Sequence, residues 1–157
     1  MRDLRTYSGS HAVRQPDCDY VGTIDVHVTL CAQRGRPFED EALARVICEN
    51  VEFYCQKLAY RLYGYTLMPD HLHTLLSPAD SQKPLSYWLD VFKSYTTNQY
   101  MKAGGRPPLW QRSAHDHVCR TEETAEAVLM YIINNPVRAE PVHCWRDWPW
   151  TRVFIEV

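Results

Sequence analysis

The chain has 157 residues, of which 45% are hydrophobic, and its formal net charge is -2. These values are typical of a globular chain with a single domain over residues 1–157. They exclude a membrane-spanning helix, since no apolar run approaches the ~20 residues that a span requires. The six cysteines form no CxxC pair, and the first residues contain no apolar signal-peptide core. We therefore expect reduced thiols and a cytoplasmic location.

The first half of the chain predicts a strand, a helix and a pair of strands. Residues 1–20 are polar and without periodicity, and we interpret them as an N-terminal arm. Strict alternation of apolar and polar residues predicts a strand over residues 23–30, and apolar residues at helical spacing predict a helix over residues 40–58. Two further strands, over residues 61–67 and 71–76, are expected to be joined by a turn that contains a proline.

The second half predicts two helices around a short strand over residues 115–119. The first of these helices opens at Pro84 and buries an apolar stripe. The other is expected to begin at Thr121, a good N-cap residue, and to end before Pro136, which lacks an N–H and clashes with the preceding turn. Residues 136–157 would then form a C-terminal tail. The order βαββαβα predicts an α+β fold, with a ferredoxin-like antiparallel sheet and helices packed on one face.

A pair of histidines, His71 and His73, stands at the start of the predicted strand 71–76. Side chains alternate along a strand, so both imidazoles point to the same face while Leu72 points to the core. Neutral imidazole is a common ligand of divalent metals. The pair therefore predicts a metal site, although the same spacing also occurs by chance on a polar strand face.

Tyr131 and Asn135 lie four residues apart in the last predicted helix, so they are neighbours on one flank. A phenol and a carboxamide could serve as a nucleophile and an oxygen ligand. The alternative is a half-buried tyrosine beside an asparagine at the end of a helix. Tyr95 and Tyr100 are rival nucleophiles on the preceding helix, and Tyr95 continues its apolar stripe, so we expect Tyr95 in the core.

Basic residues are concentrated between Lys83 and Arg120, a segment that contains six of them and two aspartates. In the whole chain arginine outnumbers lysine 13 to 4, and the planar guanidinium group can bind phosphates bidentately. A locally basic surface is compatible with DNA binding. A solvated charged surface is an equally good interpretation of this feature alone.

Several blocks of the sequence together resemble the HUH single-tyrosine transposases, in particular the REP-associated tyrosine transposases. The segment from Leu67 to His73 matches the strand that carries the HUH motif, with Leu72 as its hydrophobic residue. The segment from Tyr131 to Ala139, which reads Tyr-x-x-x-Asn-Pro-Val-Arg-Ala, matches the tyrosine helix. The run from Asp147 to Trp150, the strand around His27 to Thr29 and the Trp-Gln pair after Leu109 match as well.

The resemblance implies that the HUH strand lies centrally and that the tyrosine helix crosses near it. It implies a metal-dependent single-strand DNA endonuclease and strand transferase, with Tyr131 as the nucleophile that forms a 5′-phosphotyrosine. His71, His73 and Asn135 are the expected ligands of Mg²⁺ or Mn²⁺. The expected partner is single-stranded DNA with REP-like hairpins, in the bacterial cytoplasm and at the nucleoid when bound. A homodimer and a monomer both fit the sequence.

DNA contacts are expected outside the reacting centre. We assign base stacking to Trp110 and His115, and phosphate contact to Arg112. The N-terminal arm would add three arginines, which are Arg2, Arg5 and Arg14.

Two alternatives to a strand transferase stay open. A module of the same fold could bind hairpins without cleaving them. A zinc hydrolase is the less favoured alternative, because a second HxH occurs at His115 and His117 and could share one ion with His71 and His73.

Overall fold

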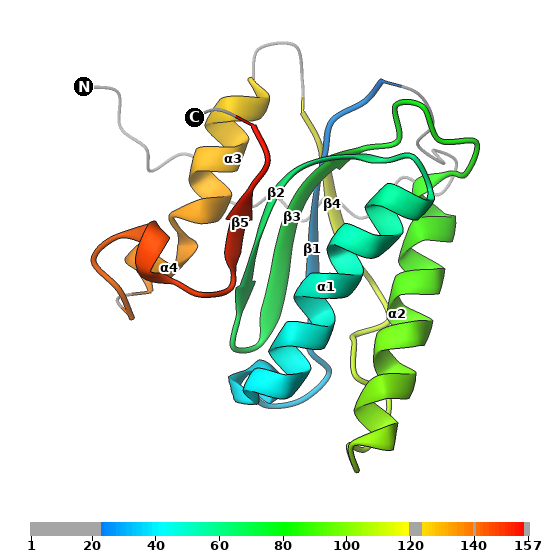
Figure 1. Ribbon diagram of the computed structural model, residues 1–157, viewed down its shortest axis with the longest axis vertical. Helices are drawn as coiled ribbons and strands as arrows, with labels where there is room; N and C mark the ends of the chain where they lie inside the picture. The colour runs from blue at the N-terminus through cyan, green and yellow to red at the C-terminus, as the bar shows by residue number, and fades with distance from the viewer. Residues whose placement is uncertain (1–22, 120–123, 140, 156–157) are drawn as a thin grey trace.

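The computed structural model describes residues 23–119, 124–139 and 141–155, which form a five-stranded antiparallel sheet with helices on both faces (Figure 1). The strands are β1 (Val26–Cys31), β2 (Arg61–Met68), β3 (His71–Ser77), β4 (His115–Val118) and β5 (Thr151–Val153). The helices are α1 (Glu41–Lys57), α2 (Leu85–Lys102), α3 (Ala125–Ile133) and the short α4 (Asn135–Arg138). Two single turns of 3-10 helix are η2 (Pro37–Glu39) and η3 (Trp145–Asp147). The α+β class and the antiparallel sheet agree with the prediction.

The strand order β4-β1-β3-β2-β5 places β3 in the middle of the sheet. The first four strands have the order of a ferredoxin-like fold, and β5 extends it. A tight hairpin joins β2 to β3, because Met68 pairs with His71 and only Pro69 and Asp70 lie between them. The strand with the two histidines is therefore central, as the resemblance implied.

One face of the sheet is covered by α1 and α2 and forms the larger core. Val28 and Leu30 of β1 and Leu72 of β3 point into it and are fully buried. Trp88 and Phe92 of α2 meet them with their rings stacked, 5.0 Å between centroids. Burial of such side chains contributes roughly 1.5–3 kcal/mol each, so this layer is the main source of stability.

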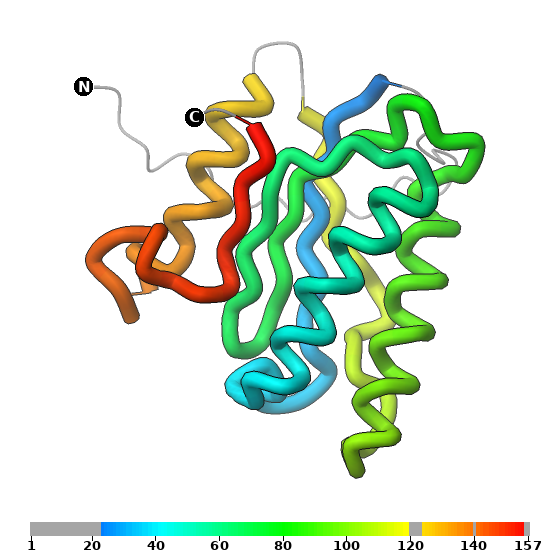
Figure 2. Tube along the Cα trace, in the orientation of Figure 1, coloured from blue at the N-terminus to red at the C-terminus, as the bar shows by residue number. Residues whose placement is uncertain are grey.

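The other face is covered by α3, which lies over β2 and β3 (Figures 1 and 2). The prediction that all helices pack on one face is therefore wrong for α3. Adjacent residues Leu75 and Leu76 are both fully buried, and alternation sends Leu75 away from α1 and α2. Leu75 packs against Leu129 and Ile132 in a second, smaller core. A central strand that is apolar on both faces needs a cover on both.

The bounds of the last helix differ from the prediction. Thr124 is the N-cap of α3, and its hydroxyl accepts a hydrogen bond from the Ala127 N–H at 3.1 Å. The predicted cap, Thr121, lies outside the described residues, as does the N-terminal arm. The helix ends at Ile133, before the proline is reached. Pro136 lies in the first turn of the next helix, α4. A proline is accepted there because the first N–H groups of a helix have no partner to lose.

The segment predicted as a tail carries β5, which no periodicity indicated. Its three residues pair with β2, and the hydroxyl groups of Thr66 and Thr151 lie 2.7 Å apart. The Trp148 indole N–H donates to the carbonyl oxygen of Leu67 at 2.9 Å. These contacts hold the segment after α4 against the strand that leads to His71.

None of the helices in the described ranges is long and apolar enough to cross a membrane.

Candidate active site

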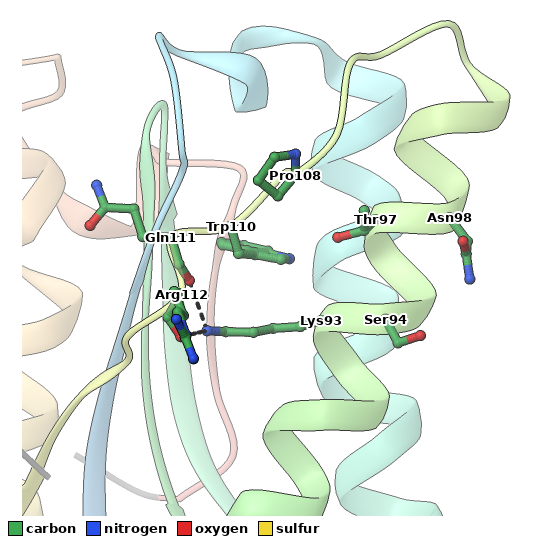
Figure 3. Close-up of a pocket in the computed structure, with 8 residues that line it drawn as sticks. All are labelled: Lys93, Ser94, Thr97, Asn98, Pro108, Trp110, Gln111 and Arg112. Atoms are coloured by element: carbon green, nitrogen blue, oxygen red, sulfur yellow. Dashed lines mark hydrogen bonds between the residues drawn. The ribbon is translucent and has the colours of Figure 1, made fainter.

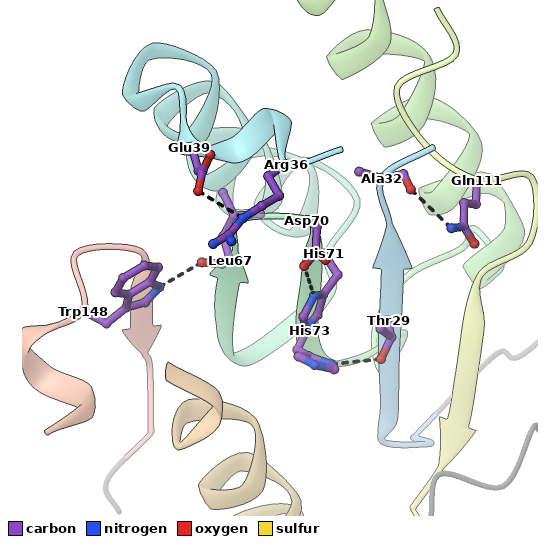
Figure 4. A network of polar contacts seen from close by, with 10 residues as sticks. All are labelled: Thr29, Ala32, Arg36, Glu39, Leu67, Asp70, His71, His73, Gln111 and Trp148. Carbon is purple, nitrogen blue, oxygen red and sulfur yellow. Dashed lines mark hydrogen bonds and ion pairs between the residues drawn. The ribbon is translucent and has the colours of Figure 1, made fainter. Parts of the chain in front are cut away.

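The two histidines of β3 lie on the face of the sheet that α3 only partly covers. The ring centroids of His71 and His73 are 4.7 Å apart, and the ring planes are nearly perpendicular at 87° (Figure 4). Leu72 between them is fully buried in the opposite core. The side chain of His71 is 27% exposed, whereas His73 is buried at 9%. One imidazole therefore faces solvent and the other lines the floor of the site.

A carboxylate fixes the ring of His71. Its Nδ1 lies 2.6 Å from the Asp70 carboxylate oxygen in the turn before β3. An ionised carboxylate only accepts hydrogen bonds, so Nδ1 carries the proton and Nε2 keeps its lone pair. No hydrogen bond occupies this Nε2 in the part of the chain that the structure covers.

The ring of His73 is held from the neighbouring strand. Its Nδ1 lies 2.9 Å from the Thr29 hydroxyl oxygen and 3.0 Å from Nε2 of His27. Thr29 is the register partner of His73 in the pairing of β1 with β3. His27 lies two residues earlier, on the same face of β1. The contacts again involve Nδ1, and none of these hydrogen bonds engages Nε2.

Burial keeps the imidazoles of His27 and His73 neutral. It lowers the pKa of His27 to about 4, with the nearby His117 adding to the shift. Burial also lowers the pKa of His73 well below its usual value, and the charges of His27, His71 and Arg138 act in the same direction. Neutral imidazoles keep a lone pair, which is the form that binds metals.

Tyr131 reaches this face from α3. Its ring lies edge-on to His27, with 6.3 Å between centroids. The guanidinium carbon of Arg138 sits 3.9 Å from the centre of the Tyr131 ring, and Arg138 is close enough to His73 to lower its pKa. The end of α3 and the start of α4 therefore bring a phenol beside His27 and a guanidinium group within electrostatic range of His73.

Asn135, the first residue of α4, is half-buried, and its side chain is hydrogen-bonded to the end of α3. Its side-chain nitrogen donates to the carbonyl oxygens of Ile132 at 3.0 Å and Tyr131 at 3.3 Å. These bonds fix the carboxamide and leave Oδ1 as its available acceptor. They do not join it to either histidine, so its role as a ligand stays a prediction.

The second HxH lies one strand further from α3, on β4. His117 pairs with His27 and His115 pairs with Thr29, so β1 separates these histidines from His73. Two strand spacings amount to roughly 9.5 Å. Within residues 23–119, 124–139 and 141–155, no three His, Cys, Asp or Glu side chains are placed to hold one metal. A zinc site shared by the four histidines is therefore contradicted by the sheet register.

The rival tyrosines belong to the other face of the sheet. Both Tyr95 and Tyr100 are on α2, which packs against the larger core. Tyr95 is 40% exposed, so the expectation that it lies in the core is wrong; the buried stripe passes through Phe92 and Thr96 instead. Tyr131 is therefore the candidate on the histidine side of the sheet.

Trp110, predicted to stack on bases, is a core residue. It is 3% exposed, its ring packs 5.0 Å from Phe38, and its indole N–H donates to the Thr96 hydroxyl at 2.9 Å. Such a ring is unavailable for stacking without unfolding the layer, and this assignment is corrected. The Trp-Gln segment instead joins the loop before β4 to the end of β1, where Gln111 donates from its backbone to the Cys31 carbonyl at 2.9 Å.

A shallow cavity of about 310 Å³ lies between α2 and that loop, and Arg112 is among the residues that line it (Figure 3). Arg112 is exposed on its wall. Lys93 closes one side, with its ammonium group donating to the carbonyl oxygens of Gln111 at 3.0 Å and Arg112 at 3.3 Å. His115 is exposed on β4. The predicted contacts Arg2, Arg5 and Arg14 lie outside the described residues.

Sequence reasoning left four residues of this site without a role. Asp70 contacts His71, and Arg138 contacts the ring of Tyr131. The other two are His27 and Thr29 of β1. The signals were present: strand alternation placed the β1 pair on one face, and Arg138 follows Tyr131 by seven residues, or about two helical turns. What was missing was the register that sets Thr29 against His73.

The sheet carries two histidines on its central strand, and α3 brings a tyrosine to the same face. Comparison with known families identifies the class of protein to which this arrangement belongs. Residues 20–135 match the model of the family described as IS200-like transposases. The chain belongs to this family.

Two relatives are REP-associated tyrosine transposases. One, from Haemophilus influenzae, is 23% identical over 117 residues, which cover 66% of this chain and 64% of the relative. The other is a structure of a REP-associated tyrosine transposase bound to a REP hairpin. It superimposes with a TM-score of 0.68 at 18% identity, covering 96% of this chain and 82% of that one. A transposase crystal structure from Deinococcus radiodurans gives a TM-score of 0.53 at 20% identity, over 74% and 94% of the two chains.

Proposed function

We propose that this protein is a metal-dependent endonuclease and strand transferase for single-stranded DNA, which forms a 5′-phosphotyrosine at REP-like hairpins. The observation that carries the proposal is the meeting of Tyr131, with Arg138 on its ring, and the histidines of β3 on one face of the sheet. The REP hairpin bound to the structurally similar transposase supports the choice of hairpin DNA, and family membership supports the transposase class.

The donor set fits a divalent cation. His71 and His73 would hold it through Nε2, because each ring has its Nδ1 engaged in a hydrogen bond on the protein side. Asn135 is the proposed third ligand through Oδ1. When bound, Mg²⁺ or Mn²⁺ would supply charge neutralisation at a non-bridging phosphate oxygen.

The protein's own groups account for the covalent step. The phenol oxygen of Tyr131 attacks phosphorus as its proton leaves, a Tyr131–phosphorus bond forms, and the bond from phosphorus to the 3′ oxygen breaks. The 3′ oxygen takes up a proton and leaves as a hydroxyl. One phosphodiester is exchanged for another, so the reverse reaction can join strands without an added energy source.

Arg138 supplies the cation that the sequence alone did not identify. A guanidinium group beside the Tyr131 ring stabilises the developing phenolate and the phosphate charge. Arg112 and its neighbours line the cavity beside α2, which is distant from the reacting centre. We propose that they bind the DNA backbone there.

The decisive experiment is incubation with single-stranded hairpin oligonucleotides and Mg²⁺ or Mn²⁺, followed by a denaturing gel for a covalent protein–DNA adduct. Tyr131→Phe, which keeps the ring and removes the attacking oxygen, should bind hairpins and give no adduct. Mass spectrometry should place the DNA on a peptide that contains Tyr131. A wild-type protein that binds hairpins tightly but gives no adduct with either metal would favour the non-cleaving module instead.

A further inference from the structure

We propose that His27 and Thr29 of β1 are positioning residues, which hold His73 with its proton on Nδ1 and its lone pair on Nε2. The inference rests on the proposed function, because it concerns the presentation of His73 to a divalent cation. No role for either β1 residue follows from the HUH pattern itself, which includes only β3.

The inference begins with three atoms that are all within hydrogen-bond distance of one another. His73 Nδ1 lies 2.9 Å from the Thr29 hydroxyl oxygen and 3.0 Å from His27 Nε2, and that hydroxyl lies 3.3 Å from the same His27 nitrogen. His27 and His73 are 6% and 9% exposed. Water cannot readily replace these bonds, so the protons must be arranged within the group.

Only two neutral arrangements satisfy the three atoms as a chain. In the first, His73 Nδ1–H donates to the Thr29 oxygen and the Thr29 hydroxyl donates to His27 Nε2. In the second, every bond is reversed, so His73 accepts at Nδ1 and carries its proton on Nε2. The first arrangement leaves a lone pair on His73 Nε2, and the second places a proton there. The Thr29 hydroxyl is the relay between the rings, because it alone can donate and accept at once, and its contact with His73 Nδ1 is 2.9 Å.

The two histidines of β3 are thus fixed by different means, for a physical reason. His71 is 27% exposed and can use a carboxylate, Asp70, which remains solvated at 56% exposure. A carboxylate next to the buried His73 would lose its hydration and cost several kcal/mol. An uncharged hydroxyl and an uncharged imidazole perform the same task in the buried position without that cost.

The β1 pair also connects the ligand to the nucleophile. His27 contacts His73 through its Nε2, while its ring meets the edge of the Tyr131 ring at 6.3 Å between centroids. A single residue on β1 therefore borders both the strand of the proposed ligands and the helix of the proposed nucleophile. Displacement of His27 would therefore disturb the positions of both His73 and Tyr131.

The first test measures binding of Mn²⁺ alone to the DNA-free protein, by titration calorimetry or electron paramagnetic resonance. Removal of a residue that orients a metal-binding histidine typically weakens affinity about 10–100-fold. Thr29→Val, which keeps the shape and removes the hydroxyl, should fall in that range, and Thr29→Ser should restore affinity to within about threefold. Thr151→Val is the matched control, because its hydroxyl bonds Thr66 and not a histidine; its Mn²⁺ affinity should equal that of the wild type.

The second test reads the proton directly. Long-range proton–nitrogen correlation spectra of the metal-free protein distinguish the two neutral tautomers of His73. The wild type should show the Nδ1–H form, and Thr29→Val should show a mixture or the Nε2–H form. An Nε2–H tautomer in the wild type, or unchanged Mn²⁺ affinity in a folded Thr29→Val protein, would overturn the inference.

The outcomes separate this inference from the proposed function. A protein with the expected tautomer and the expected loss of Mn²⁺ affinity, but with no covalent adduct on hairpin DNA, keeps the positioning role and loses the endonuclease. A protein that forms the adduct while Thr29→Val binds Mn²⁺ normally keeps the endonuclease and loses the positioning role.

Discussion

The two HxH segments have the same spacing and point to the same face of one sheet, yet their surroundings differ. His71 and His73 lie on the central strand, with a hydrogen bond to each Nδ1 and the tyrosine helix across them. His115 and His117 lie on the edge strand β4, with β1 between them and the central pair. The motif therefore acquires its chemistry from the strands on both sides of it, which a pattern of three residues cannot specify.

The middle residues sharpen the contrast. Leu72 and Asp116 both point into the core beneath α1 and α2, and they are 0% and 5% exposed. Leucine suits that place, whereas neither carboxylate oxygen of Asp116 has a hydrogen-bond partner among the residues that the structure describes. β3 therefore combines a polar face with an apolar one, whereas β4 places a carboxylate where an apolar side chain would be expected.

The largest expected effect separates the two pairs by function. His73→Ala should lower the rate of adduct formation on hairpin DNA by about three orders of magnitude, since the loss of several kcal/mol of charge stabilisation corresponds to tenfold per 1.36 kcal/mol. His117→Ala should retain a rate within about threefold of the wild type. Single-turnover kinetics measure both, and equal losses in the two variants would contradict the distinction between the strands.

Arg138→Gln should lower the adduct rate about 10²–10³-fold, the usual result of removing one electrostatic group from a reacting centre. Hairpin affinity should change little. Arg112→Gln is the comparison variant: it should leave the single-turnover rate unchanged and reduce the salt slope of hairpin binding by about 0.7. Filter binding at several salt concentrations measures the slope. A slower chemical step in Arg112→Gln would place that residue at the reacting centre.

The buried histidines His27 and His73 should also make stability depend on pH. The pKa of His27 is lowered from 6.5 to about 4 in the folded protein, so between these values the unfolded chain binds the extra proton. The free energy of unfolding should therefore fall as pH drops from 6.5 to about 4, by about 3 kcal/mol from His27 alone, with His73 acting in the same direction. Urea titrations across this range should show a shallower decline in His27→Gln than in the wild type.

The smallest effect concerns the carboxylate of the edge strand. Asp116→Leu should raise the free energy of unfolding by about 1–3 kcal/mol, because it removes a buried polar group without a partner. Thermal melts give the size and the sign. A destabilised Asp116→Leu protein would mean that the carboxylate has a favourable role that the core packing does not reveal.

The fold was predictable from the sequence wherever a long periodic pattern existed. Alternation identified the strand with His27, and helical spacing identified α1 and α2. The position of α3 on the second face was not predicted, because adjacent apolar residues such as Leu75 and Leu76 do not say which helix covers which side. The short β5 was missed because three residues are too few for any period to show.

The candidate site follows the same division. His71, His73 and Tyr131 could be selected from spacing and resemblance, and the structure brings them to one face. The supporting residues depend on strand register, which sets Thr29 opposite His73 and is not visible in a single sequence. Trp110 shows the converse: an aromatic residue in a basic segment suggested DNA, and its bond to Thr96 and its burial decide otherwise.

The pairing of β5 with β2 has a consequence for incomplete chains. Without β5, the strand that leads into His71 would become a bare edge, with unpaired N–H and C=O groups open to any other extended chain. A product that stops short of Thr151 would still contain His71, His73 and Tyr131, but its exposed strand would favour intermolecular pairing. We therefore expect truncated chains to be inactive although they retain the two histidines and the tyrosine, because they would aggregate through the exposed strand before they could act on DNA.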